Sequence, residues 1–222
     1  MSSFSEKQLG SDPIEVQDGH LYTADQICIP STCAGHVKGI LIPQGLLRDR
    51  IEKMAYDIRK HYKEGELHLL CLLKGARTFF GDLSASIFKQ GSLESSGRSL
   101  ELFHHYVQIS TYRNCAATGQ VKFVADKLTC LKGKDVLIVD DVVESGNTYR
   151  HVREWLAQFE PKSVRTVGLL QVRVKEKMPL VDFGFTGPTE WFVGYGIDYN
   201  DRFREVPHLC VLSDEAKKAL AV

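Results

Sequence analysis

The sequence has no stretch of 18 consecutive apolar residues, and its first twelve residues, MSSFSEKQLGSD, lack the apolar core of a secretory signal peptide. These absences favour a cytoplasmic protein without membrane contact. A net charge is lacking too, because 28 basic residues balance 28 acidic ones. Without a basic excess, nothing in the composition favours nucleic acid or an anionic membrane surface as a partner.

The six cysteines form no CxxC pair and show no regular spacing. Two of them lie in apolar runs, as Cys71 does in LLCLLK, where a small buried hydrophobic residue is the simplest interpretation. The pattern favours free thiols in an intracellular protein over a disulfide framework, and it gives little support to a zinc site.

The length of 222 residues fits one large domain better than two small ones. Residues 1–20 are polar and are expected to be a mobile lead-in to a single domain over residues 21–222. From Leu46 apolar residues recur at helical spacing until Gly65, which predicts one amphipathic helix. Residues 111–120, TYRNCAATGQ, have loop composition after a long strand and are a candidate lid.

Short apolar runs alternate with helical patterns along the rest of the chain. HLLCLLK at 68–74 and DVLIV at 135–139 have the length of strands, and each precedes an amphipathic helical pattern. Further strand-like runs cover 163–172, 190–197 and 208–214. Continuously apolar strands that alternate with helices predict an α/β fold with a mostly parallel, twisted sheet flanked by helices on both faces.

The segment VLIVDDVVESGNTYRHV, residues 136–152, combines a buried strand, two adjacent acids and a small Gly-containing turn before a helix. In an open parallel sheet, ligands collect beyond the carboxyl ends of the strands. Asp140 and Asp141 are at such an end and point to opposite faces, so one of them can hold a hydroxyl or a metal while the other braces the loop.

The turn after these acids is suited to a phosphate. Gly146 allows close approach to backbone N–H groups at the helix start, and Ser145 and Thr148 add hydroxyl donors, with Asn147 between them. Two acids beside a phosphate cradle make electrostatic sense if they bind hydroxyls or a divalent cation, as a sugar phosphate with Mg²⁺ would require. The alternative is an ordinary helix N-cap made by Ser145 or Asn147.

This stretch resembles the PRPP-binding signature of the type I phosphoribosyltransferases. Other segments narrow the resemblance to the hypoxanthine-guanine phosphoribosyltransferase family over roughly residues 38–215. The segments that carry it, in chain order, are LIPQGLLRDRIEKMAYDI, LLCLLKGARTFFGDL, STYRN and WFVGYGIDYNDRFREVPHLCVL. The resemblance implies a type I phosphoribosyltransferase fold, with a small hood formed by N- and C-terminal segments.

The resemblance also implies an activity: transfer of the 5-phosphoribosyl group from PRPP to hypoxanthine or guanine, giving the nucleoside monophosphate and pyrophosphate, with Mg²⁺ as cofactor. Asp140 and Asp141 would hold the ribose hydroxyls and a metal, and Glu144 would handle the purine proton. The family more often has Glu then Asp at the pair and Asp at the third position, so this chain differs at Asp140 and Glu144.

Further roles follow from the same resemblance. Lys74 and Gly75 match the pyrophosphate loop, whose Leu-Lys peptide is cis in related enzymes. Thr111 and Tyr112 match a Ser-Tyr pair that closes over the site. The remaining matches are Trp191 and Phe192 at the purine, Asp198 at a second magnesium ion, and Arg204 at pyrophosphate. A homodimer or homotetramer is implied as well.

The main departure from the family is in GLLQVRV. Val172 stands where the family has a lysine that donates to the O6 atom of the base, and valine cannot donate a hydrogen bond. Arg173 is adjacent and replaces that lysine only if the strand shifts by one residue, because alternation sends it to the other face.

Two other interpretations remain open. Glu144 and Val172 together are compatible with a paralogue that binds PRPP or nucleotide without efficient turnover, or that prefers another base. A phosphoacceptor receiver domain also has a strand that ends in two acids, but there the pair should end the first strand of a shorter chain.

Overall fold

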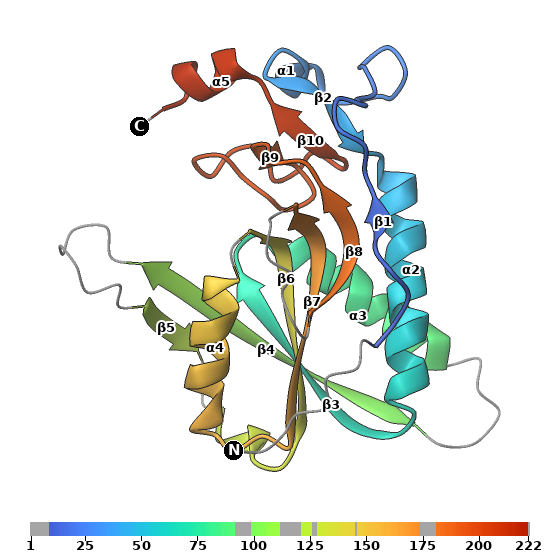
Figure 1. Cartoon of the computed structure of the whole chain (residues 1–222), viewed down its shortest axis with the longest axis vertical. Coiled ribbons are helices and arrows are strands. Elements are labelled where there is room, and N and C mark those ends of the chain that lie inside the picture. Colours follow the sequence, from blue (N-terminus) through green and yellow to red (C-terminus); the bar gives the residue numbers. More distant parts are fainter. Residues whose placement is uncertain are drawn as a thin grey trace.

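The computed structural model describes residues 9–91, 99–111, 121–125, 128–144, 146–173 and 181–221. They form two sheets, of which the larger has seven strands and carries the core (Figure 1). Its strands, in spatial order, are β1 (Ile14–Glu15), β8 (Val181–Gly187), β7 (Ser163–Val172), β6 (Asp135–Val143), β3 (Gly65–Leu73), β4 (Leu100–Thr111) and β5 (Val121–Ala125).

All neighbouring strands of this sheet pair in parallel, except β4 and β5, which are antiparallel. The central strands β3 and β6 are buried on both faces because helices cover both. Leu69 and Cys71 of β3 point to one core cluster, and Leu70 and Leu72 point to the other. The continuous apolar runs in the sequence therefore predicted the parallel sheet correctly.

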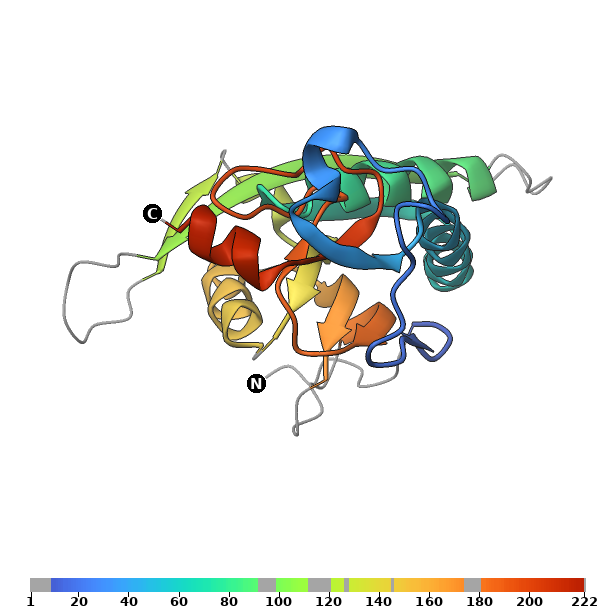
Figure 2. The same cartoon turned by 90° about the horizontal axis from the view of Figure 1, so that it is seen from above.

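Three helices cover the two faces of the sheet. The amphipathic helix predicted from Leu46 is α2 (Gln44–His61), which packs beside α3 (Arg77–Gly91) on one face. Helix α4 (Asn147–Ala157) covers the opposite face, as the view from above shows (Figure 2). None of the helices in the described parts of the chain is long and apolar enough to cross a membrane.

A second, three-stranded antiparallel sheet lies beyond the carboxyl ends of the main strands (Figure 1). It consists of β2 (Val37–Ile42), β10 (Leu209–Leu212) and β9 (Phe192–Val193), accompanied by α1 (Ser31–Ala34), α5 (Asp214–Ala219) and a core cluster of its own. This is the hood expected from N- and C-terminal segments. It covers the edge of the sheet where the sequence places the site.

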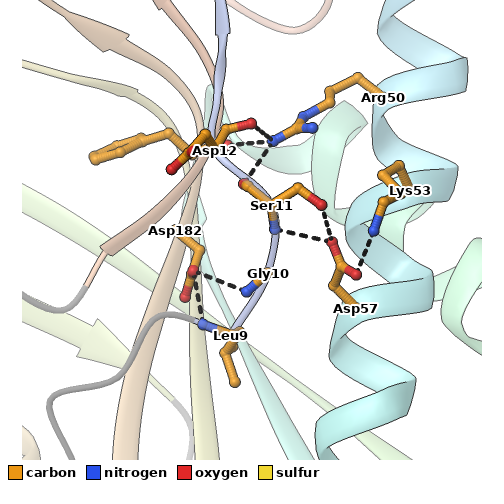
Figure 3. A network of polar contacts seen from close by, with 9 residues as sticks. Leu9, Gly10, Ser11, Asp12, Arg50, Lys53, Asp57 and Asp182 are labelled. Atoms are coloured by element: carbon orange, nitrogen blue, oxygen red, sulfur yellow. Dashed lines mark hydrogen bonds and ion pairs between the residues drawn. The ribbon is translucent and has the colours of Figure 1, made fainter.

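The N-terminal segment differs from the expected mobile lead-in over its described part, residues 9–20. Strand β1 pairs with β8, and the Nη2 atom of Arg50 donates to the carbonyls of Ser11 (3.1 Å) and Asp12 (2.8 Å). Asp57 accepts hydrogen bonds from the backbone and the hydroxyl of Ser11 (Figure 3). The polar composition of this segment reflects partners on α2, not solvent alone.

Two strand predictions need correction. The run at 190–197 forms a strand only at Phe192–Val193, because Gly194, Tyr195 and Gly196 have φ angles of 92°, 52° and 98° and turn the chain away from the sheet. Strand β8 was not predicted from the sequence, since Asp182 and Gly184 interrupt its short apolar run. The candidate lid lies mostly outside the described residues.

Candidate active site

Asp140 and Asp141 lie near the carboxyl end of β6, and both are half-buried. The Oδ1 atom of Asp140 accepts from the backbone N–H of Asp141 at 3.0 Å, and its Oδ2 atom accepts from the hydroxyl of Tyr149 at 3.1 Å. One carboxylate is thus oriented by its own strand and by α4. The other carboxylate, that of Asp141, points toward the loop that follows β3.

Asp141 faces the loop that follows β3. The peptide between Leu73 and Lys74 is cis, as the family resemblance implied. The next residue, Gly75, lies so close to Asp141 that a Cβ atom there would be 2.0 Å from Oδ2. The absence of a side chain at this position lets the loop backbone reach the acid pair.

The two carboxylates share an environment that disfavours their charge. Burial raises the pKa of Asp140 well above its usual range, and repulsion from Asp141 raises it further. Burial also raises the pKa of Asp141, although hydrogen bonds and the positive charge of Arg204 oppose this increase. A pair of acids that are costly to ionise in the absence of a partner fits a site for a cation or for sugar hydroxyls.

The turn after the acids forms an open pocket of about 200 Å³. Its lining residues are Asp140, Val142, Val143, Glu144, Gly146, Thr148 and Tyr149. Gly146 precedes helix α4 with φ at 70°, and as a glycine it has no side chain with which to cap the helix. The amides of the first turn therefore face a pocket that an anion can enter.

Charged side chains from two other segments gather beside the acids. The Nη2 atom of Arg204 is 2.7 Å from Asp198 Oδ1 and 2.9 Å from Asp201 Oδ1, and Lys74 Nζ is 3.2 Å from the same Asp201 oxygen. The Nη1 atom of Arg204 donates to the carbonyl of Gly196 at 2.9 Å. The fold thus brings the two cations predicted to bind pyrophosphate onto one carboxylate.

On the hood side, Trp191 keeps 59% of its surface exposed and packs edge to face against Tyr199, with 5.6 Å between ring centroids. An exposed aromatic face at this position can stack on a planar ring. Val172 is buried at the end of β7, with 2% of its surface exposed.

Two assignments to the base site are wrong in this structure. Phe192 is 7% exposed and belongs to the main core, because strand alternation sends it away from the face that Trp191 presents. Arg173 donates to the carbonyl of Val16 at 2.8 Å and pairs with Glu15 and Asp18 of the N-terminal segment. Its guanidinium is therefore not available to replace the missing lysine.

Comparisons with known proteins agree with this geometry. A family model described as phosphoribosyl transferase domain matches residues 42–200. The hypoxanthine-guanine-xanthine phosphoribosyltransferase of Plasmodium falciparum is 40% identical over 93% of this chain and 91% of that protein. The chain belongs to the hypoxanthine-guanine phosphoribosyltransferase family.

Other members of this phosphoribosyltransferase family show the same coverage. The hypoxanthine-guanine phosphoribosyltransferases of Rattus norvegicus and Homo sapiens are each 36% identical over 88% of this chain and 90% of theirs. The crystal structure of the Schistosoma mansoni enzyme in complex with IMP has a TM-score of 0.77, at 26% identity, and the match covers 94% of this chain and 99% of that one. The type I phosphoribosyltransferase fold is thereby confirmed.

Two residues that touch the predicted site residues were missed from the sequence. Tyr149 lies at the helix start and looked like part of a helical pattern, and Asp201 looked like part of a turn. The only signal for Asp201 was its place within the polar block around Asp198 and Arg204. Tyr149 had no signal, because its contact with Asp140 spans a strand end and a turn.

Three predicted site residues cannot be placed in the phosphoribosyltransferase site. Tyr112 and Ser145 lie outside the described residues. Thr111 is the last residue of β4, and its side chain is not among those described.

Proposed function

We propose that this chain transfers the 5-phosphoribosyl group of PRPP to a 6-oxopurine, hypoxanthine or guanine, in purine salvage. The bond from the ribose C1 atom to pyrophosphate breaks, a bond from C1 to the purine nitrogen N9 forms, and the purine loses one proton. The products are the nucleoside monophosphate and pyrophosphate. The observation that carries the proposal is the meeting of the β6 acid pair, the glycine turn before α4 and two cations at one edge of the sheet.

The 5′-phosphate is assigned to the turn over residues 144–148. Gly146 opens the first amides of α4 to an anion, and Thr148 lines the same pocket. Ser145 and Asn147 complete the segment assigned to this phosphate. An anion in this pocket interacts with oriented N–H dipoles, so the absence of lysine and arginine from the pocket lining is not an obstacle.

Asp140 and Asp141 are assigned to the ribose hydroxyls and to Mg²⁺, with Asp198 at a second ion. These side chains offer the hard oxygen donors that Mg²⁺ prefers, and their raised pKa values mean that a bound cation would relieve the cost of their charge. When bound, Mg²⁺ neutralises charge on the pyrophosphate that leaves. Asp198 already pairs with Arg204, so an ion there would share the carboxylate with the guanidinium.

Lys74 and Arg204 are assigned to the pyrophosphate. In this structure both pair with Asp201, an exposed carboxylate that lies where an anionic ligand would sit. Pyrophosphate offers these two cations several oxygens, so it would displace Asp201 as their partner. The backbone of Gly75 is assigned to the same loop because it borders both the acids and Lys74.

Glu144 is assigned to the purine proton, and Trp191 to stacking on the purine ring. Glu144 lines the pocket beside Asp140, which supports its assignment next to the reacting groups. It is one methylene longer than the family aspartate, which allows proton transfer if the base sits slightly farther from the turn. Thr111 and Tyr112 are assigned to closure over the site, which would exclude water.

The decisive test is to incubate the purified full chain with PRPP, Mg²⁺ and one base at a time from hypoxanthine, guanine, xanthine and adenine. Formation of a nucleoside monophosphate with hypoxanthine or guanine is the expected result. Brisk turnover with adenine alone would contradict the 6-oxopurine assignment. PRPP binding by calorimetry without turnover of any base would favour the second candidate, a nucleotide-binding paralogue, which Glu144 and Val172 motivate.

We also propose that the chain is a cytoplasmic homodimer or homotetramer. The described cysteines, Cys28, Cys33, Cys71, Cys130 and Cys210, are free thiols, which suits a reducing compartment. Large apolar side chains are exposed on α2 and α3, and such a surface favours contact with a second copy of the chain. They are Leu46 and Tyr56 on α2 and Phe88 on α3. Light scattering after size-exclusion chromatography would give the mass, and a monomer at micromolar concentration would contradict this proposal.

A further inference from the structure

His68, His105 and Cys130 come together on the face of the sheet that α4 covers. One ligand atom from each of the three side chains lies within 4.8 Å of the other two. His68 Nδ1 and His105 Nε2 are 2.9 Å apart, with the ring planes only 8° from parallel. Two imidazoles and a thiol at this separation are the ligand types that bind zinc and related transition metals.

The fold brings these residues together from three separate elements. His68 is on β3, His105 is on the adjacent strand β4, and Cys130 is in the short 3-10 helix η1 (Thr129–Leu131). His105 pairs in register with Leu70, two residues beyond His68, so both histidines face the same side. His68 pairs with Val136 of β6, four residues before Asp140, so about 13 Å of strand separates this cluster from the acid pair and the PRPP site.

A carboxylate behind His68 sets which ring nitrogen is free to bind a metal. Glu66 Oε2 lies 3.6 Å from His68 Nε2 and 2.7 Å from Lys134 Nζ. Within the described residues Nε2 is buried without a hydrogen-bond partner, so the nearby negative charge of Glu66 favours a proton on Nε2 and leaves the lone pair of Nδ1 on the side of His105. A histidine backed by a carboxylate on its other nitrogen is the usual outer-shell arrangement of a bound metal.

The exposure of the cluster also suits a metal. His68 is only 2% exposed, whereas Cys130 is exposed to solvent. An ion would therefore have a fixed inner ligand and an outer ligand that solvent can reach.

We propose that His68 Nδ1, His105 Nε2 and Cys130 Sγ bind one divalent transition-metal ion, zinc by preference, with water as the fourth ligand. Binding releases the thiol proton of Cys130 to solvent and moves the ring proton of His105 from Nε2 to Nδ1. Tetrahedral coordination at about 2.0–2.1 Å per nitrogen sets the two nitrogens about 3.3 Å apart. A small movement of His105 would widen the gap between the two nitrogens to this distance. His105 has room to move because β5 pairs with β4 only from Val107 onward.

The ion would link η1 to β3 and β4. In the sequence η1 comes directly before β6, the strand that carries the acid pair. The ion would bind the folded chain preferentially, since the three ligands are distant in sequence and are brought together by folding. Zinc is therefore expected to raise the melting temperature of the protein without PRPP or base.

The test uses the untagged full chain and Co²⁺ as a spectroscopic probe. One equivalent of Co²⁺ should give a thiolate-to-cobalt charge-transfer band, and Zn²⁺ should abolish this band by displacement. Cys130→Ser should lose the band, whereas Cys28→Ser, which removes another exposed thiol, should retain it. Because position 130 is exposed, both variants should fold, and unchanged melting temperatures without metal would verify this.

A second variant tests the outer shell. Glu66→Gln should retain the band but weaken Zn²⁺ affinity by about 10- to 100-fold in a competition titration with a chelator. Failure to form a cobalt band, or a band that persists in Cys130→Ser, would overturn the proposal. Equal affinity in Glu66→Gln and the parent chain would overturn the role of Glu66.

Discussion

The backbone of Gly75 lies so close to the carboxylate of Asp141 that a Cβ atom at position 75 would be 2.0 Å from Oδ2. Gly75→Ala should therefore displace either the loop after Lys74 or the acid. We expect kcat/KM for PRPP to fall more than tenfold, because misplaced groups lose their alignment with the reacting atoms. Steady-state kinetics with varied PRPP would measure this.

Gly81→Ala is the matched control for this substitution. Gly81 lies in helix α3, and nothing is within 4 Å of the position that its Cβ would take. Alanine in a helix interior is favoured over glycine by about 0.5–1 kcal/mol, so this variant should melt slightly higher and keep its activity. If both variants had parent-like kcat/KM, the contact with Asp141 would have no part in catalysis.

Asp141→Asn should stabilise the protein at neutral pH while it weakens PRPP binding. Folding raises the pKa of this carboxyl above its value of 3.8 in the unfolded chain, so its ionisation opposes folding as the pH rises through the folded value. Asparagine does not titrate and also removes the repulsion on Asp140. The gain in melting temperature should be largest at pH 7–8 and shrink as the pH falls toward 4.

Thermal melts across this pH range would check the prediction, and each kcal/mol should appear as about 2–4 °C for a chain of this size. Asp49→Asn, at an exposed position on α2, serves as the control. A gain that is independent of pH would show that the ionisation of Asp141 is not its cause.

Glu144→Gln tests the assignment of the purine proton. The amide keeps the size of the side chain but cannot accept the proton, so kcat should fall by about 10²- to 10⁴-fold while the Kd for PRPP changes little. Single-turnover kinetics and calorimetry would separate the two quantities. Glu154→Gln, at an exposed position on α4, is the control, and equal losses in kcat and PRPP affinity would reject the assignment.

Val172→Lys tests how the base oxygen is read. If Val172 borders the base, a lysine amine that reaches O6 should lower KM for hypoxanthine and guanine by about 10- to 100-fold, the equivalent of roughly 1–3 kcal/mol. Val172 is almost fully buried, so the amine must extend past the core to the site, and the melting temperature should fall.

Val172→Met controls for length without charge and should leave KM unchanged. Adenine, which lacks O6, should gain nothing from Val172→Lys. If the folded lysine variant had the parent KM for both 6-oxopurines, another group would have to read the oxygen, and Arg173 is excluded from this role while it pairs with Asp18 and Glu15.

Much of the site could be predicted because its parts are local in sequence. The strand, acid pair and glycine turn at residues 136–148 form one continuous segment, so the sequence fully predicted their order along β6 and α4. The same holds for the parallel sheet, whose buried strands are apolar runs. The hood followed from the family resemblance, which covers both of its segments.

The rest depended on contacts between distant residues. The direction of Arg173 is set by the N-terminal segment more than 150 residues away, and Phe192 is buried because β9, paired with β10, turns this side chain toward the main core. Asp201 belongs to the site because the fold places it beside Lys74, the residue that follows β3. A local sequence pattern does not show which distant side chain will form such a contact.

The cysteine spacing argued against a zinc site, and this inference considered only ligands near one another in sequence. His68, His105 and Cys130 are 37 and 25 residues apart in sequence, and sheet pairing with the turn η1 brings them within reach of one ion. The sequence by itself determined the elements, the acid pair and the phosphate turn, because short-range periodicity and composition specify these. Only the tertiary structure decided which distant side chains share a site, because strand register and helix packing fix those distances.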